Sequence, residues 1–282
     1  MAIIGFWSGS KKETGQTVSI ASIATQMAVE HNYKILLIDA TFDDDTMERC
    51  FWNVKVNVKK DIAKQLNKGK MDISSGAEGL VSAVASNKAT PEIITNFTRV
   101  VFKNRLDVVC GLKTKVREDY IKSLMLYKDL LKAADKYYDL VFVDLEKTLN
   151  DETTKVLLET SHVIIYTFTK NLRQADEYLE YMGKFPELLK TEKVIPLLGN
   201  SDDNTVYNPK NYTRYINEKR EIISVPYNTS FVKNISEAGV AQFFLTSRLA
   251  GKLNDKNTEL TASVENACKR IIEKLKELNL KP

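Results

Sequence analysis

The sequence predicts a doubly wound α/β fold, with a mainly parallel sheet that carries helices on both faces. Short apolar segments alternate with amphipathic segments over almost the whole chain of 282 residues. The short segments are apolar on both sides, as strands are when a parallel sheet is covered on both faces. Because neither a repeat nor a clear linker interrupts this alternation, we expect one domain over residues 1–282.

Seven segments of the chain are predicted to be strands. Each is a short apolar run of the length that strands usually have. In chain order they are Ala2–Trp7, Lys34–Asp39, Leu106–Cys110, Leu140–Asp144, Val163–Phe168, Val194–Leu198 and Glu221–Val225. Helices fit between most of them, as the crossovers between parallel strands require.

Four segments are predicted to be helices because their apolar residues form one stripe. In Thr17–Glu30 the stripe consists of Ile20, Ile23, Ala24, Met27 and Ala28. The other three segments are Glu118–Tyr137, Asn171–Lys184 and Thr261–Leu278. The stretch from Phe51 to Thr98 is rich in Lys, Asn and Gly, and we expect only short helices there.

The composition places the protein in a reducing compartment. Cys50, Cys110 and Cys268 are odd in number and widely spaced, which argues against a disulfide framework and against a Cys-x-x-Cys metal site. There is no secretory signal and no apolar stretch long enough to span a bilayer, so we expect a cytoplasmic protein. The net charge of +4 permits contact with nucleic acid or an acidic membrane without requiring it.

The loop after the first predicted strand has the composition of a phosphate-binding loop. Compared with the pattern G-x-x-x-x-G-K-[ST], Ser10 takes the place of the first glycine and Gly15 is the second. Gln16 replaces the lysine, and Thr17 keeps the hydroxyl that binds Mg²⁺. A helix that starts directly after such a loop points its N–H groups and its dipole at phosphate. The alternative is a polar turn that binds no ligand.

Two aspartates end predicted strands, where ligands bind in open α/β sheets. Asp39 and Asp144 are therefore candidate ligand-binding residues, and the alternative is that each caps the next helix or turn. The run Asp43–Asp45 could also help to hold Mg²⁺, but we favour a solvated helix start. His31 and His162 are the only histidines, and we expect both to be structural.

Taken in order, these motifs resemble those of MinD/ParA ATPases, a family of P-loop proteins. The resemblance extends over nearly the whole chain, and each motif is short. The matching segments are Ser10–Thr17, Tyr33–Asp39, Tyr138–Asp144, Thr169 with Arg173, Ala175 and Asp176, Leu198–Asn200, Val225–Asn228 and Glu237–Gly239. The resemblance implies a P-loop NTPase fold, ATP and Mg²⁺ as cofactors, and a homodimer.

The resemblance also assigns the site residues. The family's loop, Lys-Gly-Gly-x-Gly-Lys-Thr, begins with a lysine that reaches the partner's phosphates across a dimer, and Lys11 matches it. The resemblance implies catalytic roles for Lys11, Asp39 and Asp144, and Mg²⁺ binding by Thr17, Asp39 and Asp144. The nucleotide-binding residues implied are Lys11, Lys12, Glu13, Thr14, Gly15, Gln16, Thr17, Val18, Asn200, which reads the adenine, Pro226 and Tyr227.

Three departures from the family pattern predict a weak ATPase at most. Gln16 brings no charge to the phosphates, and Thr41 stands where the family usually has the aspartate that orients the attacking water. The small switch residues that follow the family's Walker B aspartate are replaced by Leu145–Lys147. Nucleotide binding is weakened mainly by the loss of one contact to the phosphates, whereas hydrolysis is weakened by all three departures. We therefore expect a nucleotide-binding protein with slow turnover.

Atypical loops are typical of the TadZ/CpaE branch of the family, which places pilus and secretion machinery. This branch is the nearest by resemblance and implies pilus or secretion proteins as partners. The first alternative is a partition protein, which binds DNA and a partition partner. The second alternative is a structural member of the family that binds no ligand. MinD proteins use a basic amphipathic C-terminus at membranes, but we expect the last helix here to pack on its own sheet.

Overall fold

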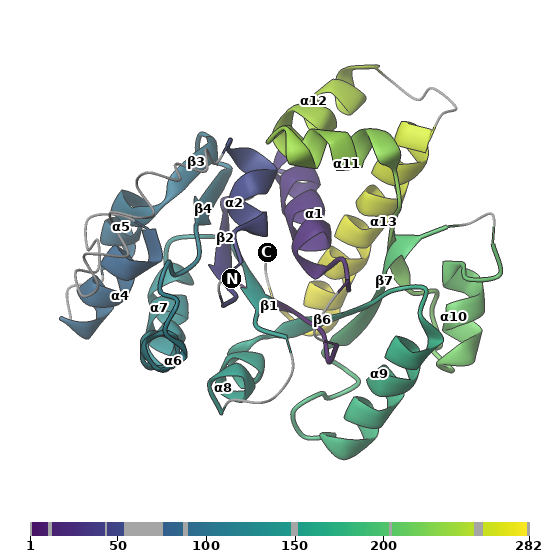
Figure 1. Ribbon diagram of the computed structural model, residues 1–282, viewed down its shortest axis with the longest axis horizontal. Helices are drawn as coiled ribbons and strands as arrows, with labels where there is room; N and C mark the ends of the chain where they lie inside the picture. Colours follow the sequence, from purple (N-terminus) through teal and green to yellow (C-terminus); the bar gives the residue numbers. More distant parts are fainter. Residues whose placement is uncertain are drawn as a thin grey trace.

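The computed structural model describes residues 2–10, 13–42, 44–53, 76–86, 90–147, 152–202, 205–250 and 256–280. Within them the strands form one sheet in the order β3-β4-β2-β5-β1-β6-β7-β8 (Figure 1). Their bounds are β1 Ala2–Trp7, β2 Ile35–Ala40, β3 Arg99–Phe102, β4 Leu106–Val109, β5 Leu140–Leu145, β6 Val163–Phe168, β7 Val194–Ser201 and β8 Ile223–Pro226. All seven predicted strands are present.

The sheet is parallel except at one edge. The pairings from β4 to β8 are parallel, and only β3 runs antiparallel, to β4. This confirms the predicted doubly wound, mainly parallel sheet. The strand β3 was not predicted because it lies at the edge, where two of its residues are exposed and two only half-buried. Its apolar run, Val100–Phe102, is also only three residues long, which is shorter than the runs on which the other strands were predicted.

Helices cover both faces of the sheet (Figure 1). Buried side chains of α1, α2, α11, α12 and α13 form a hydrophobic cluster on one face, and those of α4 and α6 to α10 form one on the other. The bounds are α1 Gln16–Glu30, α2 Thr46–Phe51, α4 Gly76–Ala85, α5 Pro91–Ile94, α6 Arg117–Leu124, α7 Tyr127–Ala134, α8 Glu152–Thr160, α9 Leu172–Lys184, α10 Pro209–Tyr215, α11 Thr229–Ser236, α12 Val240–Ala250 and α13 Lys256–Glu277.

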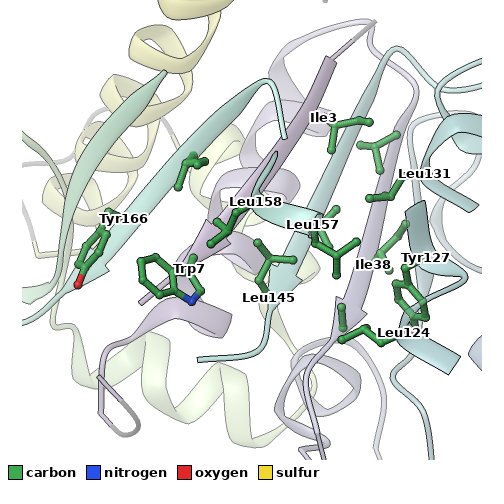
Figure 2. Packing of buried hydrophobic residues seen from close by; sticks show 14 of the residues in the cluster. Ile3, Trp7, Ile38, Leu124, Tyr127, Leu131, Leu145, Leu157, Leu158 and Tyr166 are labelled. Carbon is green, nitrogen blue, oxygen red and sulfur yellow. The ribbon is translucent and has the colours of Figure 1, made fainter. Parts of the chain in front are cut away.

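Alternation along the first strand divides its side chains between the two clusters. Ile4 and Phe6 belong to one cluster, whereas Ile3 and Trp7 belong to the other, because successive residues of a strand point to opposite faces. Figure 2 shows the second cluster, in which Trp7 and Tyr166 lie on neighbouring strands. Their rings meet edge to face with centroids 5.2 Å apart. Trp7 is thus fixed immediately before the polar loop.

The prediction of one helix over Glu118–Tyr137 is wrong, since α6 and α7 are separate helices. The chain turns at Met125 and Leu126, where Leu126 N–H donates to the carbonyl of Ser123, three residues back. Buried residues continue on both sides of the turn, with Leu124 before it and Tyr127 after it. The apolar stripe therefore spans the break and does not reveal it.

The last helix packs on its own sheet, as expected. Val264, Ala267, Ile271 and Leu275 are fully buried in α13, which lies against α1 and β8. Among the described residues, no helix is both long enough and apolar enough to cross a membrane. In the stretch Phe51–Thr98, the short helices α4 and α5 are present, and residues 54–75 and 87–89 lie outside the described ranges.

The histidines and cysteines have structural positions. His162 accepts a hydrogen bond at Nδ1 from the N–H of Ile3 at 2.9 Å, and His31 stacks on Tyr33. The three cysteines are free and buried. The histidines thus have the structural roles expected from the sequence, and the cysteines form no disulfide among the described residues.

Candidate functional site

The described part of the loop between β1 and α1 contains two residues with a left-handed backbone. Gly15, the residue before α1, has φ 68° and ψ 11°, a left-handed conformation that suits glycine. Glu13 has φ 56°, although a side chain there costs roughly 1–2 kcal/mol. By the resemblance seen in the sequence, Glu13 matches a glycine of the MinD/ParA loop, and its left-handed backbone is one that glycine adopts readily. Lys11 and Lys12 lie outside the described residues.

The start of α1 leaves polar groups free for an anion. Among the described residues no side chain caps the helix, and its first turn contains no acidic residue. The first N–H groups of an uncapped helix lack partners and carry the positive end of its dipole. The buried hydroxyl of Thr14 also has no partner among the described residues. This end of the helix therefore fits a phosphate group.

Residues of β6 and α9 hold the first half of the loop. The N–H of Gly9 donates to the hydroxyl of Tyr166 at 3.2 Å, and the Ser10 hydroxyl donates to the carboxylate of Glu177. A Cβ atom on Gly9 would lie 2.4 Å from the ring of Tyr181, so only glycine fits. These contacts join positions about 160 residues apart.

The end of β7 packs directly against the second half of the loop. A Cβ atom on Gly199 would lie 2.6 Å from the carbonyl oxygen of Thr14, so the two backbones are in contact. This places Asn200, the predicted adenine-reading residue, beside Gly15. Asn200 has φ 51°, a conformation that asparagine tolerates better than most residues.

Gln16, the residue in the lysine position, is turned toward the sheet. Its Nε2 donates to Asp144 Oδ1 and to the carbonyl oxygen of Leu145, both at 2.7 Å. Both hydrogens of the amide are therefore used. The remaining oxygen, Oε1, is buried and has no partner among the described residues. The side chain thus presents no free donor and no charge to a phosphate group.

The two strand-end aspartates lie side by side. Asp39 and Asp144 face each other in the parallel register of β2 and β5, and their residues are 2% and 0% exposed. Burial, and then the charge of Asp144, raise the pKa of Asp39 to about 8, against two hydrogen bonds from Thr41. Burial raises the pKa of Asp144 to about 6, although hydrogen bonds from Thr17 and Gln16 oppose this.

These oxygen atoms fit Mg²⁺ held together with a phosphate. Thr17 lies beside Asp144, whose Oδ2 is buried and without a partner among the described residues. In the part of the chain that the structure describes, no three His, Cys, Asp or Glu residues form a group that could hold a metal alone. Mg²⁺ commonly binds through one or two carboxylates plus the phosphates of a nucleotide. Thr17, Asp144 and Asp39 suit that mode.

A small cavity lies beside the loop, where the base of a nucleotide is expected. It is bordered by α1, the end of β7, the segment after β8, and α11. Its lining residues are Gly15, Val18, Ser19, Asn200, Val225, Pro226, Tyr227, Asn228, Phe231, Val232 and Ile235. The fold thus brings together the predicted residues Val18, Asn200, Pro226 and Tyr227. Tyr227 is 55% exposed, so a base held there would remain partly in solvent.

The acidic run before α2 is a helix start, as favoured from the sequence. Asp44 accepts a hydrogen bond from the N–H of Thr46 at 2.8 Å, and Asp45 pairs with Arg49 at 2.7 Å. Asp43 lies outside the described residues. Thr41, the replaced switch position, donates from its N–H and its hydroxyl to Asp39 Oδ1 at 3.0 and 2.7 Å.

Three contacts around the site were not found from the sequence. Glu177 and Tyr181 reach the loop from α9, and Glu146 Oε2 accepts the N–H of Phe42 at 2.7 Å. Asn228 was recognised only as part of a motif. Its side chain caps α11 and donates to Lys256 and Asn257, so it has a structural role.

No protein-family model matches the sequence, and no curated protein is similar to it. The fold, however, is similar to many solved structures. A ParA family ATPase from Chlorobium tepidum has a TM-score of 0.68 at 15% identity, with 93% of this chain and 98% of that chain covered.

Two further similar structures contain nucleotides. A protein from Borrelia burgdorferi, described as a plasmid partition protein and bound to AMPPNP, has a TM-score of 0.61 at 16% identity, covering 96% and 99% of the two chains. The septum site-determining protein MinD of Pyrococcus horikoshii, complexed with Mg-ADP, has a TM-score of 0.62 at 13% identity, covering 97% and 98%. At these identities the similarity establishes the fold: the chain has the MinD/ParA P-loop NTPase fold.

Proposed function

We propose that this chain is a nucleotide-binding, dimer-forming positioning protein of the MinD/ParA family that hydrolyses ATP slowly. One observation carries the proposal. A phosphate loop with an uncapped helix start and paired strand-end aspartates is kept, while the residue in the lysine position, Gln16, is bound to β5. The nucleotides in two similar structures support nucleotide binding by this chain. We also propose one domain over residues 1–282.

The residues divide into three roles in this proposal. Backbone N–H groups at the start of α1 would hold the phosphates. Oxygen atoms of Thr17, Asp39 and Asp144 would hold Mg²⁺, which neutralises charge on the phosphates when bound. The residues around Asn200 and Tyr227 would hold the adenine.

Binding is expected to stabilise the protein strongly. At a free Mg-ATP concentration of 100 times Kd, mass action adds about 2.7 kcal/mol to the free energy of unfolding. A thermal melt with and without Mg-ATP measures this, and calorimetry gives Kd. Thr17→Ala is expected to reduce the gain because it removes a metal ligand. Thr25→Ala, at a threonine of the same helix whose hydroxyl donates to the carbonyl of Ala21, is the control. An unmoved melting temperature with no calorimetric heat would contradict nucleotide binding.

Dimerisation is expected to depend on the nucleotide and on Lys11. By resemblance, Lys11 reaches the phosphates of the partner subunit, and a closed two-fold pair is the commonest oligomer. Sedimentation with Mg-ATP is expected to show a dimer that Lys11→Ala weakens. Lys190→Ala, which removes an exposed lysine far from the loop in the chain, is the control. A monomer with and without nucleotide would remove this part of the proposal.

We propose two candidates for what this protein positions in the cell. The resemblance to TadZ/CpaE favours a pilus or secretion assembly, and the similar Borrelia structure favours plasmid partition as the second candidate. Retention on DNA that weakens steeply with salt would support partition, since phosphate contacts release counterions. Co-purification with pilus or secretion proteins from the native cell would support the first candidate.

A further inference from the structure

The segments that follow β2 and β5 are tied together by the protein's own side chains. Gln16 on α1 donates to Asp144 and to the carbonyl of Leu145, both at the end of β5. Glu146, the residue directly after Leu145, accepts a hydrogen bond from the N–H of Phe42 at 2.7 Å. Phe42 lies in the segment after β2. A carboxylate that accepts a backbone N–H makes one of the stronger kinds of hydrogen bond. We call these contacts of Gln16 and Glu146 the brace.

In nucleotide switches, the corresponding segments are ordered by contacts with the γ-phosphate and its Mg²⁺, and they are released after hydrolysis. Here the brace supplies contacts to the same segments from the protein's own side chains. Thr41 is held as well, since its N–H and hydroxyl both donate to Asp39. The protein's own side chains therefore hold part of both segments in place.

The brace also removes one means of recognising a third phosphate. Both amide hydrogens of Gln16 are used within the protein, and its unpaired atom is the acceptor Oε1. An acceptor gains nothing from phosphate oxygens, which are acceptors themselves. A lysine at this position would add a positive charge, and hydrogen bonds between charged groups are about twice as strong as neutral ones.

From these contacts we infer that the site binds nucleoside diphosphates and triphosphates equally well, with Gln16 and Glu146 as the positioning residues responsible. The inference rests on the proposed nucleotide binding and specifies its substrate class. A protein of this kind would hold one conformation whichever nucleotide it carries.

The brace is tested first in the nucleotide-free protein, by hydrogen exchange of the Phe42 amide. We expect this amide to be protected without nucleotide and equally protected with Mg-ADP or Mg-ATP. Glu146→Ala should raise its exchange rate at least about tenfold, whereas Glu146→Gln, which keeps an acceptor oxygen, should restore much of the protection. Glu180→Ala, at an exposed glutamate of α9, is the control. Protection that arises only with Mg-ATP would overturn the inference.

The nucleotide preference is tested by calorimetry with Mg-ADP and Mg-ATP. We expect the two Kd values of the parent protein to agree within about threefold, and Gln16→Lys to favour Mg-ATP by at least about tenfold. Gln26→Ala, which removes another buried glutamine of α1, is the control, and its ratio should match the parent's. Gln16→Met provides a neutral variant should the buried lysine prevent folding, and its ratio should stay near one.

The outcomes separate this inference from the proposed function. A parent protein that binds Mg-ATP at least tenfold more tightly than Mg-ADP overturns the inference and leaves nucleotide binding in place. A parent protein that binds neither nucleotide overturns both, and the exchange of the Phe42 amide then shows whether the brace exists independently.

Discussion

Replacing Gln16 by lysine is expected to raise the rate of ATP hydrolysis about 100-fold above that of the parent chain, which should stay below roughly 1 s⁻¹, the low end of ordinary enzyme rates. Phosphoryl transfer depends on cations that neutralise charge on the transferred group, and one well-placed donor contributes roughly 10²–10³ in rate. Gln16 supplies neither, since its amide hydrogens are held by Asp144 and Leu145. A lysine there would find the Asp144 carboxylate close by, so its charge need not be buried unpaired.

Adding Thr41→Asp to this variant is expected to raise turnover further. By the resemblance seen in the sequence, Thr41 stands where MinD/ParA ATPases usually have the aspartate that orients the attacking water, and its hydroxyl donates to Asp39. Phosphate release by pure protein measures the rates, and thermal melts verify that each variant is folded. Gln16→Met, which is neutral, should remain as slow as the parent and serves as the control.

Two results would contradict this prediction. Parent turnover at or above roughly 1 s⁻¹ would show that Gln16 does not limit hydrolysis. A double variant as slow as the parent would place the limitation elsewhere, with Leu145–Lys147 as the next segment to change.

Asp39→Asn is expected to stabilise the nucleotide-free protein by about 3 kcal/mol at pH 8 and by little at pH 4. Burial raises the pKa of Asp39 to about 8, whereas an unfolded aspartate titrates near 3.8. Unfolding therefore releases a proton between these pH values, so this carboxyl lowers the free energy of unfolding progressively as pH rises from about 4 to about 8. Each pKa unit corresponds to about 1.36 kcal/mol in the free energy of unfolding. We expect roughly half of the free energy that this pKa difference implies, because the structure relaxes locally around the ionised carboxyl.

Asparagine preserves the local geometry in this test. Its side-chain oxygen can accept the two hydrogen bonds that Thr41 now donates to Asp39 Oδ1. Denaturant unfolding at pH 4, 6 and 8 measures the effect, and Asp119→Asn, at an exposed aspartate of α6, is the control. Equal stability of parent and Asp39→Asn at pH 8 would show that Asp39 carries no desolvation cost. The same substitution should weaken Mg-ATP binding, because it removes a proposed metal ligand.

Much of the fold and part of the site follow from short-range signals. Buried strands such as Leu140–Asp144 were recognised because both of their faces are apolar, and the structure contains each of the seven. Asp39 and Asp144 could be paired in advance, because the carboxyl ends of neighbouring parallel strands meet at one edge of the sheet. The loop at Gly15 was recognisable because only a few residue types suit its backbone.

Other features depend on contacts between distant parts of the chain. The sequence shows that Gln16 has no charge, but not that its amide binds Asp144, 128 residues away. Nothing local indicates that Glu146 holds Phe42 or that Glu177 holds Ser10, 104 and 167 residues apart. Such pairs form only when the whole sheet is assembled.

By itself, the sequence determined the doubly wound sheet, the polar loop before the first helix and the two strand-end aspartates, because hydrophobic periodicity and backbone preference act over a few residues. The tertiary structure alone decided the break between α6 and α7, the edge strand β3, and the binding of Gln16 and Glu146 to their partners. Each of these is selected by burial and hydrogen bonding among segments far apart in the chain. For a buried polar side chain such as Gln16, the partner rather than the residue type decides what remains available to a ligand.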